Sequence, residues 1–287
     1  MAANSRRARR EPLADSKTEA VVTQAVRSLL TVTVLLLCAI AVNAQAPKTI
    51  PRTADGKPDL SGVWVAGTQP LLLGEQEAAK LRAADAAAGR PAFRREPPPY
   101  KPEYEAKRLE FVARRGVDDP MARCLLSGVP RVTTRPLPFQ IVQTKDLVVI
   151  LYEAHHAFRI IPTDGRPHPE DIEPSYLGDS IGRWDGDTLV VDVVGFNDKT
   201  WLAGTGTIHS EQLHVVERYT RDTPESIVYD VTIEDPVVFT KPWRQQEILH
   251  LRPGERIREY ECIENNQDLQ RIEKLLQNES TFRVPAR

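Results

Sequence analysis

Residues 180–196 read SIGRWDGDTLVVDVVGF, and this stretch decides the fold. Asp185-Gly186-Asp187 stands between two runs that are rich in β-branched and aromatic side chains. Asp-Gly accepts the positive φ angles of a primed hairpin turn, and β-branched residues favour strands. The stretch therefore predicts two antiparallel strands, at residues 180–184 and 188–196, joined by a tight turn.

The same pattern of short strands and turns continues through most of the chain. In residues 212–221, Leu213, Val215 and Tyr219 alternate with polar residues and share one face of a strand with Glu217. Closing the sheet would remove exposed sheet edges, so a barrel is favoured over an open sandwich. Further strands are predicted at residues 59–65, 139–144, 147–153, 157–161, 226–234, 243–251 and 256–263.

Residues 68–138 interrupt this pattern and form a predicted annex. Residues 75–88 are rich in alanine and charge and predict a helix, and residues 102–115 predict an amphipathic helix that Gly116 ends. Residues 267–277 place Leu269, Ile272, Leu275 and Leu276 at helical spacing. The predicted fold class is mainly β: an antiparallel up-and-down barrel with a helical, proline-rich annex and a C-terminal helix.

The N-terminal segment has the order of a secretory signal peptide. Basic residues precede the apolar run LLTVTVLLLCAIAV at residues 29–42, and Asn43-Ala44-Gln45-Ala46 is a small-residue cleavage site. The run is shorter than the ~20 residues of a spanning helix, although an uncleaved anchor is an alternative. Cleavage after Ala44 or after Ala46 fits equally, and no stable membrane span is expected afterwards.

The predicted organisation has four parts. Residues 1–46 are a signal peptide, residues 47–58 a proline-containing linker, residues 59–277 a single barrel domain with its annex, and residues 278–287 a tail. The expected location is periplasmic or extracellular. In such an oxidising compartment the two remaining cysteines, Cys124 and Cys262, predict a disulfide, with two buried free thiols as the alternative.

Gly62-Val63-Trp64 resembles the G-x-W signature of the lipocalins and their calycin relatives. This resemblance implies that Trp64 plugs the closed end of a barrel, with an arginine from a late strand, Arg256 or Arg258, stacked on it. Four longer runs resemble a group of exported proteins of soil bacteria, which implies export and nothing about chemistry. These runs are DGKPDLSGVW, YEAHHAFRIIPTDGR, SIGRWDGDTLVVDVVGFNDKTWL and HSEQLHVVERY.

The densest polar cluster is residues 153–159, EAHHAFR. On a strand, His155 and Arg159 would share a face with Glu153, and His156 would lie opposite. A histidine that faces a cavity can act as acid or base near neutral pH, whereas one in the wall is structural. Asp192, amid apolar neighbours, is expected to be buried with a partner or to face a polar lumen. The catalytic candidates are therefore His155, His156, Glu153 and Asp192.

A second polar cluster surrounds His209 and His214, and residues 196–201 form a polar-aromatic loop that either caps a barrel mouth or is turn chemistry. The two histidines would lie on opposite faces of a strand, so no metal site is predicted. The chain has no Gly-rich phosphate loop or dinucleotide fingerprint, so no cofactor is predicted. The ligand-binding candidates are Arg159, Trp184, Asn197, Asp198, Trp201, His209, His214 and Arg218.

These features favour an exported small-molecule-binding protein with a hydrophobic ligand in the barrel cavity. One alternative is a periplasmic barrel enzyme that uses a His–acid pair to hydrate, isomerise or hydrolyse a lipid- or terpenoid-like substrate. Another is an envelope structural or interaction protein. The formal net charge of −2 gives no electrostatic case for nucleic acid. The sequence leaves catalysis, ligand identity and oligomeric state open.

Overall fold

A computed structural model describes residues 49–67, 75–89, 94–114, 116–204, 206–264 and 266–277. All of them belong to one compact unit, Thr49–Arg287. The predicted signal peptide and C-terminal tail lie outside the described residues.

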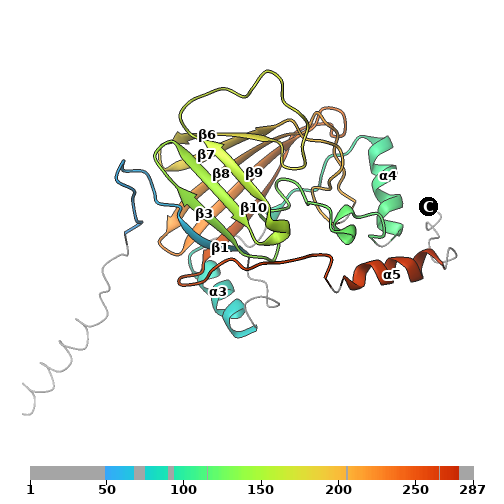
Figure 1. The fold of residues 1–287 in the computed structure, drawn as a ribbon, viewed down its shortest axis with the longest axis horizontal. Helices are drawn as coiled ribbons and strands as arrows, with labels where there is room; N and C mark the ends of the chain where they lie inside the picture. The colour runs from blue at the N-terminus through green and yellow to red at the C-terminus, as the bar shows by residue number, and fades with distance from the viewer. Residues whose placement is uncertain are drawn as a thin grey trace, which may run out of the picture. The chain divides into compact units, whose positions relative to one another are not determined.

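Nine strands of the described residues form a nearly closed antiparallel barrel, which confirms the predicted fold class (Figure 1). The sheet order is β5-β4-β3-β1-β10-β9-β8-β7-β6, so most neighbours in the barrel wall follow one another along the chain, whereas β1 pairs with β10, the last strand. The short β2 (Arg94–Arg95) also pairs with β10. The nine strands are β1 (Gly62–Ala66), β3 (Phe139–Gln143), β4 (Leu147–Tyr152), β5 (Phe158–Pro162), β6 (Asp179–Asp185), β7 (Thr188–Val194), β8 (His214–Thr223), β9 (Ser226–Glu234) and β10 (Trp243–Leu251).

The barrel closes where β5 meets β6, the two strands at which the sheet pairing ends. Arg159 on β5 donates a hydrogen bond to Ser180 Oγ on β6, at 2.9 Å. Gly182 on β6 has no side chain at the closest approach, and a Cβ there would lie 2.9 Å from Thr163 Cγ2 and 3.0 Å from Ile161 Cγ2. Side-chain contacts therefore join β5 to β6, the two edge strands of the sheet, and Gly182 allows them to approach closely.

The barrel interior is packed with side chains. Buried positions alternate along several strands, as predicted, and on β8 they include Val215, Glu217 and Tyr219, all with an exposed fraction of 0%. If a cavity large enough for a water molecule lay beside one of these side chains, that side chain would have accessible surface. Their exposed fraction of 0% therefore means that no such cavity adjoins them. The largest side chains buried in this way are Trp64, Trp243, Tyr219, Tyr229, Phe139 and Phe196.

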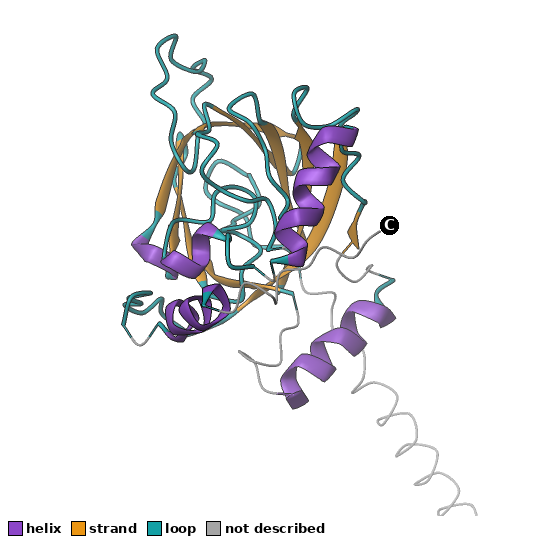
Figure 2. Ribbon diagram, turned by 90° about the vertical axis from the view of Figure 1, so that its right-hand side faces the viewer, coloured by secondary structure: helices purple, strands orange, loops and turns teal. Residues whose placement is uncertain are grey.

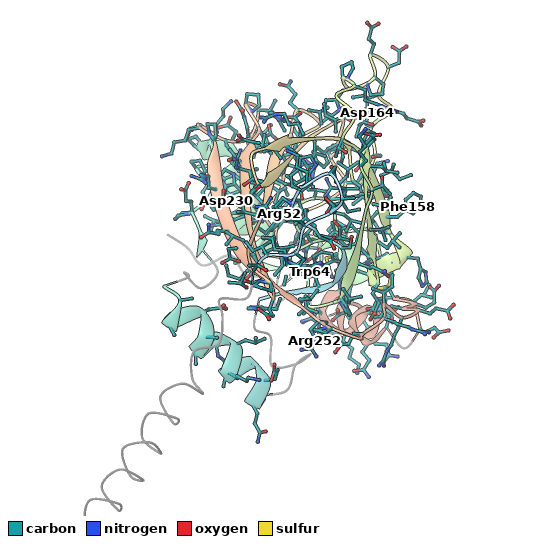
Figure 3. The ribbon with its side chains drawn as sticks, turned by 90° about the vertical axis from the view of Figure 1, so that its left-hand side faces the viewer. Arg52, Trp64, Phe158, Asp164, Asp230 and Arg252 are labelled. Carbon is teal, nitrogen blue, oxygen red and sulfur yellow. A yellow bond between two sulfur atoms is a disulfide. The ribbon has the colours of Figure 1, made fainter. Side chains whose placement is uncertain are left out.

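Trp64 lies at one end of the barrel, which the chain before β1 covers (Figure 3). Its indole Nε1 donates to the Leu60 carbonyl oxygen at 2.9 Å. The guanidinium carbon of Arg221, on β8, lies 5.2 Å from the centroid of the Trp64 ring. Arg221 also donates to the carbonyl oxygens of Asp59 and Pro224. An arginine from a late strand thus stacks on Trp64, as the resemblance implied.

The arginine is not Arg256 or Arg258, and the strand predicted at residues 256–263 is wrong. Both arginines are exposed in an irregular segment. β10 already pairs with β9 on one edge and with β1 on the other, so no edge remains for a further strand.

The described part of the predicted linker is folded against the same end of the barrel. Arg52 donates to both carboxylate oxygens of Asp187, in the β6–β7 hairpin, at 2.9 and 2.5 Å. Thr53 and Lys57 close a turn through a backbone hydrogen bond. These contacts fix residues 49–58 in place.

Helices α4 (Pro102–Ala113) and α5 (Gln267–Leu276) and long loops lie at the opposite end, which we call the mouth (Figure 2), whereas α3 (Glu75–Ala87) lies beside β1 and β10 (Figure 1). These helices lie where the sequence predicts them. The predicted disulfide is confirmed: Cys124 follows the short helix η1 (Pro120–Arg123), and Cys262 lies in residues 252–264, which we call the strap. None of the helices in the described residues is long and apolar enough to cross a membrane.

Candidate functional site

Residues 153–157 form a tight turn between β4 and β5, which corrects the predicted strand. Ala154–His156 is a single 3₁₀ turn, η2, in which His155 and His156 have φ angles of 59° and 49°. Glu153, His155 and Arg159 therefore do not share a strand face. The connection is too short for β structure because the Tyr152 N–H already bonds to the Ala157 carbonyl oxygen across the turn.

The strap lies over this turn and fixes it. The Arg258 N–H donates to Glu153 Oε2 at 2.7 Å, and the Tyr260 N–H donates to His156 Nε2 at 3.2 Å. His156 Nδ1 lies 3.5 Å from Glu261 Oε1. Three contacts from one segment hold two non-glycine residues in the left-handed region, where backbone strain is often associated with function.

His155 points to the other side of the turn, where its Nε2 lies 3.4 Å from Arg135 Nη1. Burial, with the positive charges of Arg135 and His156, lowers the pKa of His155 below its usual value. The imidazole is therefore neutral at pH 7 and can accept a proton or a hydrogen bond.

Two clefts share Glu261 and Cys262 of the strap as wall residues. The smaller, which we call the histidine cleft, has a volume of about 570 Å³ and brings two imidazoles and a carboxylate to one cavity. It is lined by Arg123, Cys124, Leu126, His155, His156, Ala157, Phe158, Leu177, Glu261, Cys262 and Ile263.

The larger cleft lies at the mouth, between α4, η1, the strap and α5, and we call it the mouth cleft. Its volume is about 800 Å³. An apolar wall from Phe111, Val112, Met121 and Ala122 faces polar groups that include three arginines. The polar lining consists of Asp119, Arg131, Arg135, Tyr260, Glu261, Glu264, Asn266, Gln267, Asp268 and Arg271.

Arg159 lies in the barrel interior instead of at a binding surface. Its guanidinium forms a two-pronged ion pair with Glu217, at 3.1 and 2.5 Å. The hydroxyls of Tyr219 and Tyr229 donate to Glu217 Oε1 at 3.0 and 2.6 Å. Burial alone would lower the pKa of Arg159, but Glu217 outweighs it and holds that pKa well above the usual value. The pair is thus charged, enclosed and without access for a ligand.

Asp192 lies on the outer face of β7, neither buried nor in a lumen. Its two carboxylate oxygens lie 3.0 Å from His168 Nε2 and 3.0 Å from His214 Nε2. His168 Nδ1 contacts Asp179 Oδ1 at 2.5 Å, and His214 Nδ1 lies 3.8 Å from Glu234 Oε2. Partial burial raises the pKa of Asp192, but hydrogen bonds to His214 and His168 outweigh it, so the pKa is lowered.

The loop after β7 is held by local bonds. Asn197 Oδ1 accepts a hydrogen bond from the Lys199 N–H at 3.2 Å, as turn chemistry predicts, and Asp198 is exposed. His209 is buried and its Nδ1 donates to the Ser210 carbonyl oxygen at 2.9 Å, so Nε2 accepts from Thr200 at 2.7 Å. Trp201 packs on Phe111 of α4 with ring centroids 5.1 Å apart, which ties this loop to the mouth cleft.

Two other candidates lie away from both clefts. Arg218 is on the outer face of β8 and donates to Asp185 at 2.9 Å. Trp184 is partly buried, and Lys57 Nζ lies 5.7 Å from its ring centroid. Neither contributes to the lining of the mouth cleft or the histidine cleft.

These observations define a disulfide-bonded antiparallel β-barrel with two clefts beside its C-terminal strap. No family model matches the chain, and the curated proteins and solved structures likewise give no match. Within the described ranges, no group of three His, Cys, Asp or Glu side chains is arranged to hold a metal ion.

Sequence reasoning missed the residues that only tertiary structure brings to a site. Arg135 stands in a proline-interrupted run without any local pattern, and His168 lies in a long loop after β5. Arg221 carried a usable signal, because it ends the alternating strand β8, where an arginine could reach a tryptophan on β1.

Proposed function

We propose that this protein binds a small, largely apolar molecule in the mouth cleft, in a non-reducing compartment. The cleft volume of about 800 Å³ carries the proposal, because small-molecule sites occupy about 300–1,000 Å³. The barrel supports the walls of the cleft, and the disulfide between Cys124 and Cys262 supports a non-reducing compartment. Export through the predicted signal peptide would deliver the chain there.

The barrel interior is the weaker location for this ligand. Side chains such as Trp64, Phe139 and Tyr229 already occupy it at an exposed fraction of 0%. A ligand inside would have to displace close-packed side chains, at a cost that packing studies put at about 1–3 kcal/mol or more. The mouth cleft needs no such displacement.

Binding of Nile red, a neutral apolar fluorophore, tests the location with two matched variants. Val112→Glu places a charge on the apolar wall of the mouth cleft, whereas Val142→Glu places one on the outer face of β3; the two valines are 45% and 40% exposed. We expect Val112→Glu to weaken binding about tenfold, which is about 1.4 kcal/mol, and Val142→Glu to leave it unchanged.

Two results would contradict the proposal. One is the absence of Nile red binding at micromolar concentration by a folded, disulfide-bonded chain. The other is weaker binding by Val142→Glu alone, which would assign the probe to the exposed apolar face around Phe158 and Ile160, the feature that an envelope-interaction role would use.

An acid–base enzyme is the second candidate, and the histidine cleft favours it. His155, His156 and Glu261 all line this one cavity, and the lowered pKa of His155 suits a proton acceptor. Asp192 and Glu217 are excluded as partners of these histidines because each already binds other groups.

Asparagine substitutions test the catalytic role, because asparagine tolerates the positive φ at both positions. Turnover of lipid esters or epoxides by the purified protein should fall at least a hundredfold in His155→Asn, with Tm nearly unchanged. A variant that turns over normally, or a wild type without turnover, would contradict the enzyme candidate.

A further inference from the structure

We propose that the ligand of the mouth cleft carries a carboxylate, and that Arg135 binds it. This inference rests on the proposed function and specifies its ligand class. Among the residues that the structure describes, Arg135 Nη1 has as hydrogen-bond partners the Met121 sulfur, at 3.3 Å, and His155 Nε2, at 3.4 Å. Its Nε is buried and has no hydrogen-bond partner among the described residues.

Arg131, four residues earlier and in the same cleft, provides the contrast. It donates from both terminal nitrogens to the two oxygens of Asp119, at 2.9 and 2.7 Å. Arg159 likewise has Glu217 as its dedicated carboxylate. Arg135 has no ion pair with any residue that the structure describes, although it lines a cleft with a volume of about 800 Å³.

Three of the acidic groups of the cleft already have other partners. Asp119 is bound to Arg131, Glu261 lies 3.5 Å from His156, and Asp268 lies 3.4 Å from Arg271. Glu264 is exposed at the rim. No carboxylate of the cleft is therefore committed to Arg135.

A guanidinium presents five N–H donors in a planar fork that matches a carboxylate. Burial lowers the pKa of Arg135, because desolvation disfavours its charged form. Arg131 adds a like charge nearby, and Tyr260 and Asp119 offset these effects on the pKa only in part. An entering carboxylate would supply the missing counter-charge and acceptors. Arg135 Nη1 now donates to the Met121 thioether, which is a weak acceptor, and lies 3.4 Å from the neutral His155 imidazole, a long contact that a carboxylate could replace.

The apolar wall of the cleft indicates the chemical character of the ligand beyond its carboxylate. Phe111, Val112, Met121 and Ala122 line the cleft beside Arg135 and offer no charge. A carboxylate at Arg135 therefore leaves an apolar body to pack on α4 and η1. Medium-chain fatty acids and aromatic carboxylic acids share this chemistry.

Calorimetric titration with decanoate and with decanol, which share one chain length, tests the head group. We expect the disulfide-bonded wild type to bind decanoate at least tenfold more tightly than decanol. Arg135→Gln should reduce this preference to less than twofold, and Arg135→Lys should retain part of it. Arg218→Gln, which removes an arginine on the outer face of β8 and outside both clefts, should leave the preference intact. Arg271→Gln, in the lining of the same cleft, should reduce the preference by less than Arg135→Gln does. The same titration with benzoate and naphthoate, each compared with its corresponding alcohol, shows whether the cleft prefers an aromatic or an aliphatic ligand.

The wild-type comparison needs no variant, so the inference stands or falls even if Arg135→Gln does not fold. Equal affinity for decanoate and decanol would overturn the carboxylate while leaving the mouth cleft as a binding site. An equal loss in Arg271→Gln and Arg135→Gln would also overturn it, because the rim would then recognise the charge. Failure of Nile red and decanol alike would instead reject the proposed function itself.

Discussion

Glu217 occupies the centre of the barrel, with Arg159 and two tyrosine hydroxyls as its partners. Glutamate on an alternating strand is an unusual inward residue, yet the alternation of Leu213, Val215 and Tyr219 already predicted its face, and this is confirmed. Its partner was not predictable, because Arg159 lies 58 residues away and meets it only when β5 closes on β6.

Glu217→Gln should destabilise the fold by about 3–5 kcal/mol, because it leaves the Arg159 guanidinium buried without a counter-charge. The free energy of unfolding in urea measures this loss. A double variant, Glu217→Leu with Arg159→Met, should recover most of it, since an apolar pair of similar volume often replaces a buried ion pair. Equal losses in the single and double variants would refute the explanation by an unpaired charge.

Asp192 should contribute stability that depends on pH. Its folded pKa is lowered, so its stabilising contribution is present above the unfolded pKa of about 3.9 and is lost as pH falls through the folded value. Asp192→Asn should therefore flatten the acid side of a plot of denaturation midpoint against pH. The control is Asp171→Asn at an exposed carboxylate, and parallel acid limbs for Asp192→Asn and wild type would contradict the prediction.

At the scale of elements, β8 and the chain before β1 meet through Arg221. Its guanidinium stacks on the Trp64 ring and donates to two carbonyl oxygens. One belongs to Asp59, before β1, and the other to Pro224, in the turn between β8 and β9. The motif around Trp64 predicted that an arginine would lie there. Which arginine does so depends on the curvature of the wall, because two strands separate β1 from β8 and the Arg221 side chain reaches Trp64 across the end of the barrel.

Arg221→Ala should cost about 1–3 kcal/mol of unfolding free energy, through two lost carbonyl partners and one cation–π contact. It should also speed hydrogen exchange of the Trp64 indole N–H. The controls Arg256→Ala and Arg258→Ala remove exposed side chains and should stay within about 0.5 kcal/mol of wild type. A larger effect at Arg256 or Arg258 would mean that these arginines cap the barrel.

At the scale of the whole molecule, the disulfide joins η1 to the strap and so forms part of both clefts. The bridge closes a loop of 138 residues, for which the chain-entropy model gives about 5 kcal/mol of stabilisation. The disulfide fixes the position of the strap, and the hydrogen bonds from the strap to Glu153 and His156 require that position.

The double variant Cys124→Ala/Cys262→Ala should lower the unfolding free energy by about 2–5 kcal/mol and weaken Nile red binding. The far-UV circular dichroism of the barrel strands should persist, because the disulfide joins none of them. Wild-type protein under reducing conditions should behave in the same way. Unchanged binding in both cases would mean that the strap does not shape the mouth cleft.

The sequence by itself determined the nine strands of the nearly closed barrel, the helices and the cysteine pair, because side-chain alternation, helical spacing and turn residues act between neighbours along the chain. It also placed a strand at residues 256–263, where β10 has no free edge to pair with. It failed at the strand face that Glu153, His155 and Arg159 were expected to share, because residues 154–156 form a tight turn. Tertiary structure alone decided that Asp192 binds two histidines outside the barrel and that Arg135 faces a cleft without a counter-charge. Such pairings depend on strand register, barrel closure and the path of the strap, which no local pattern specifies.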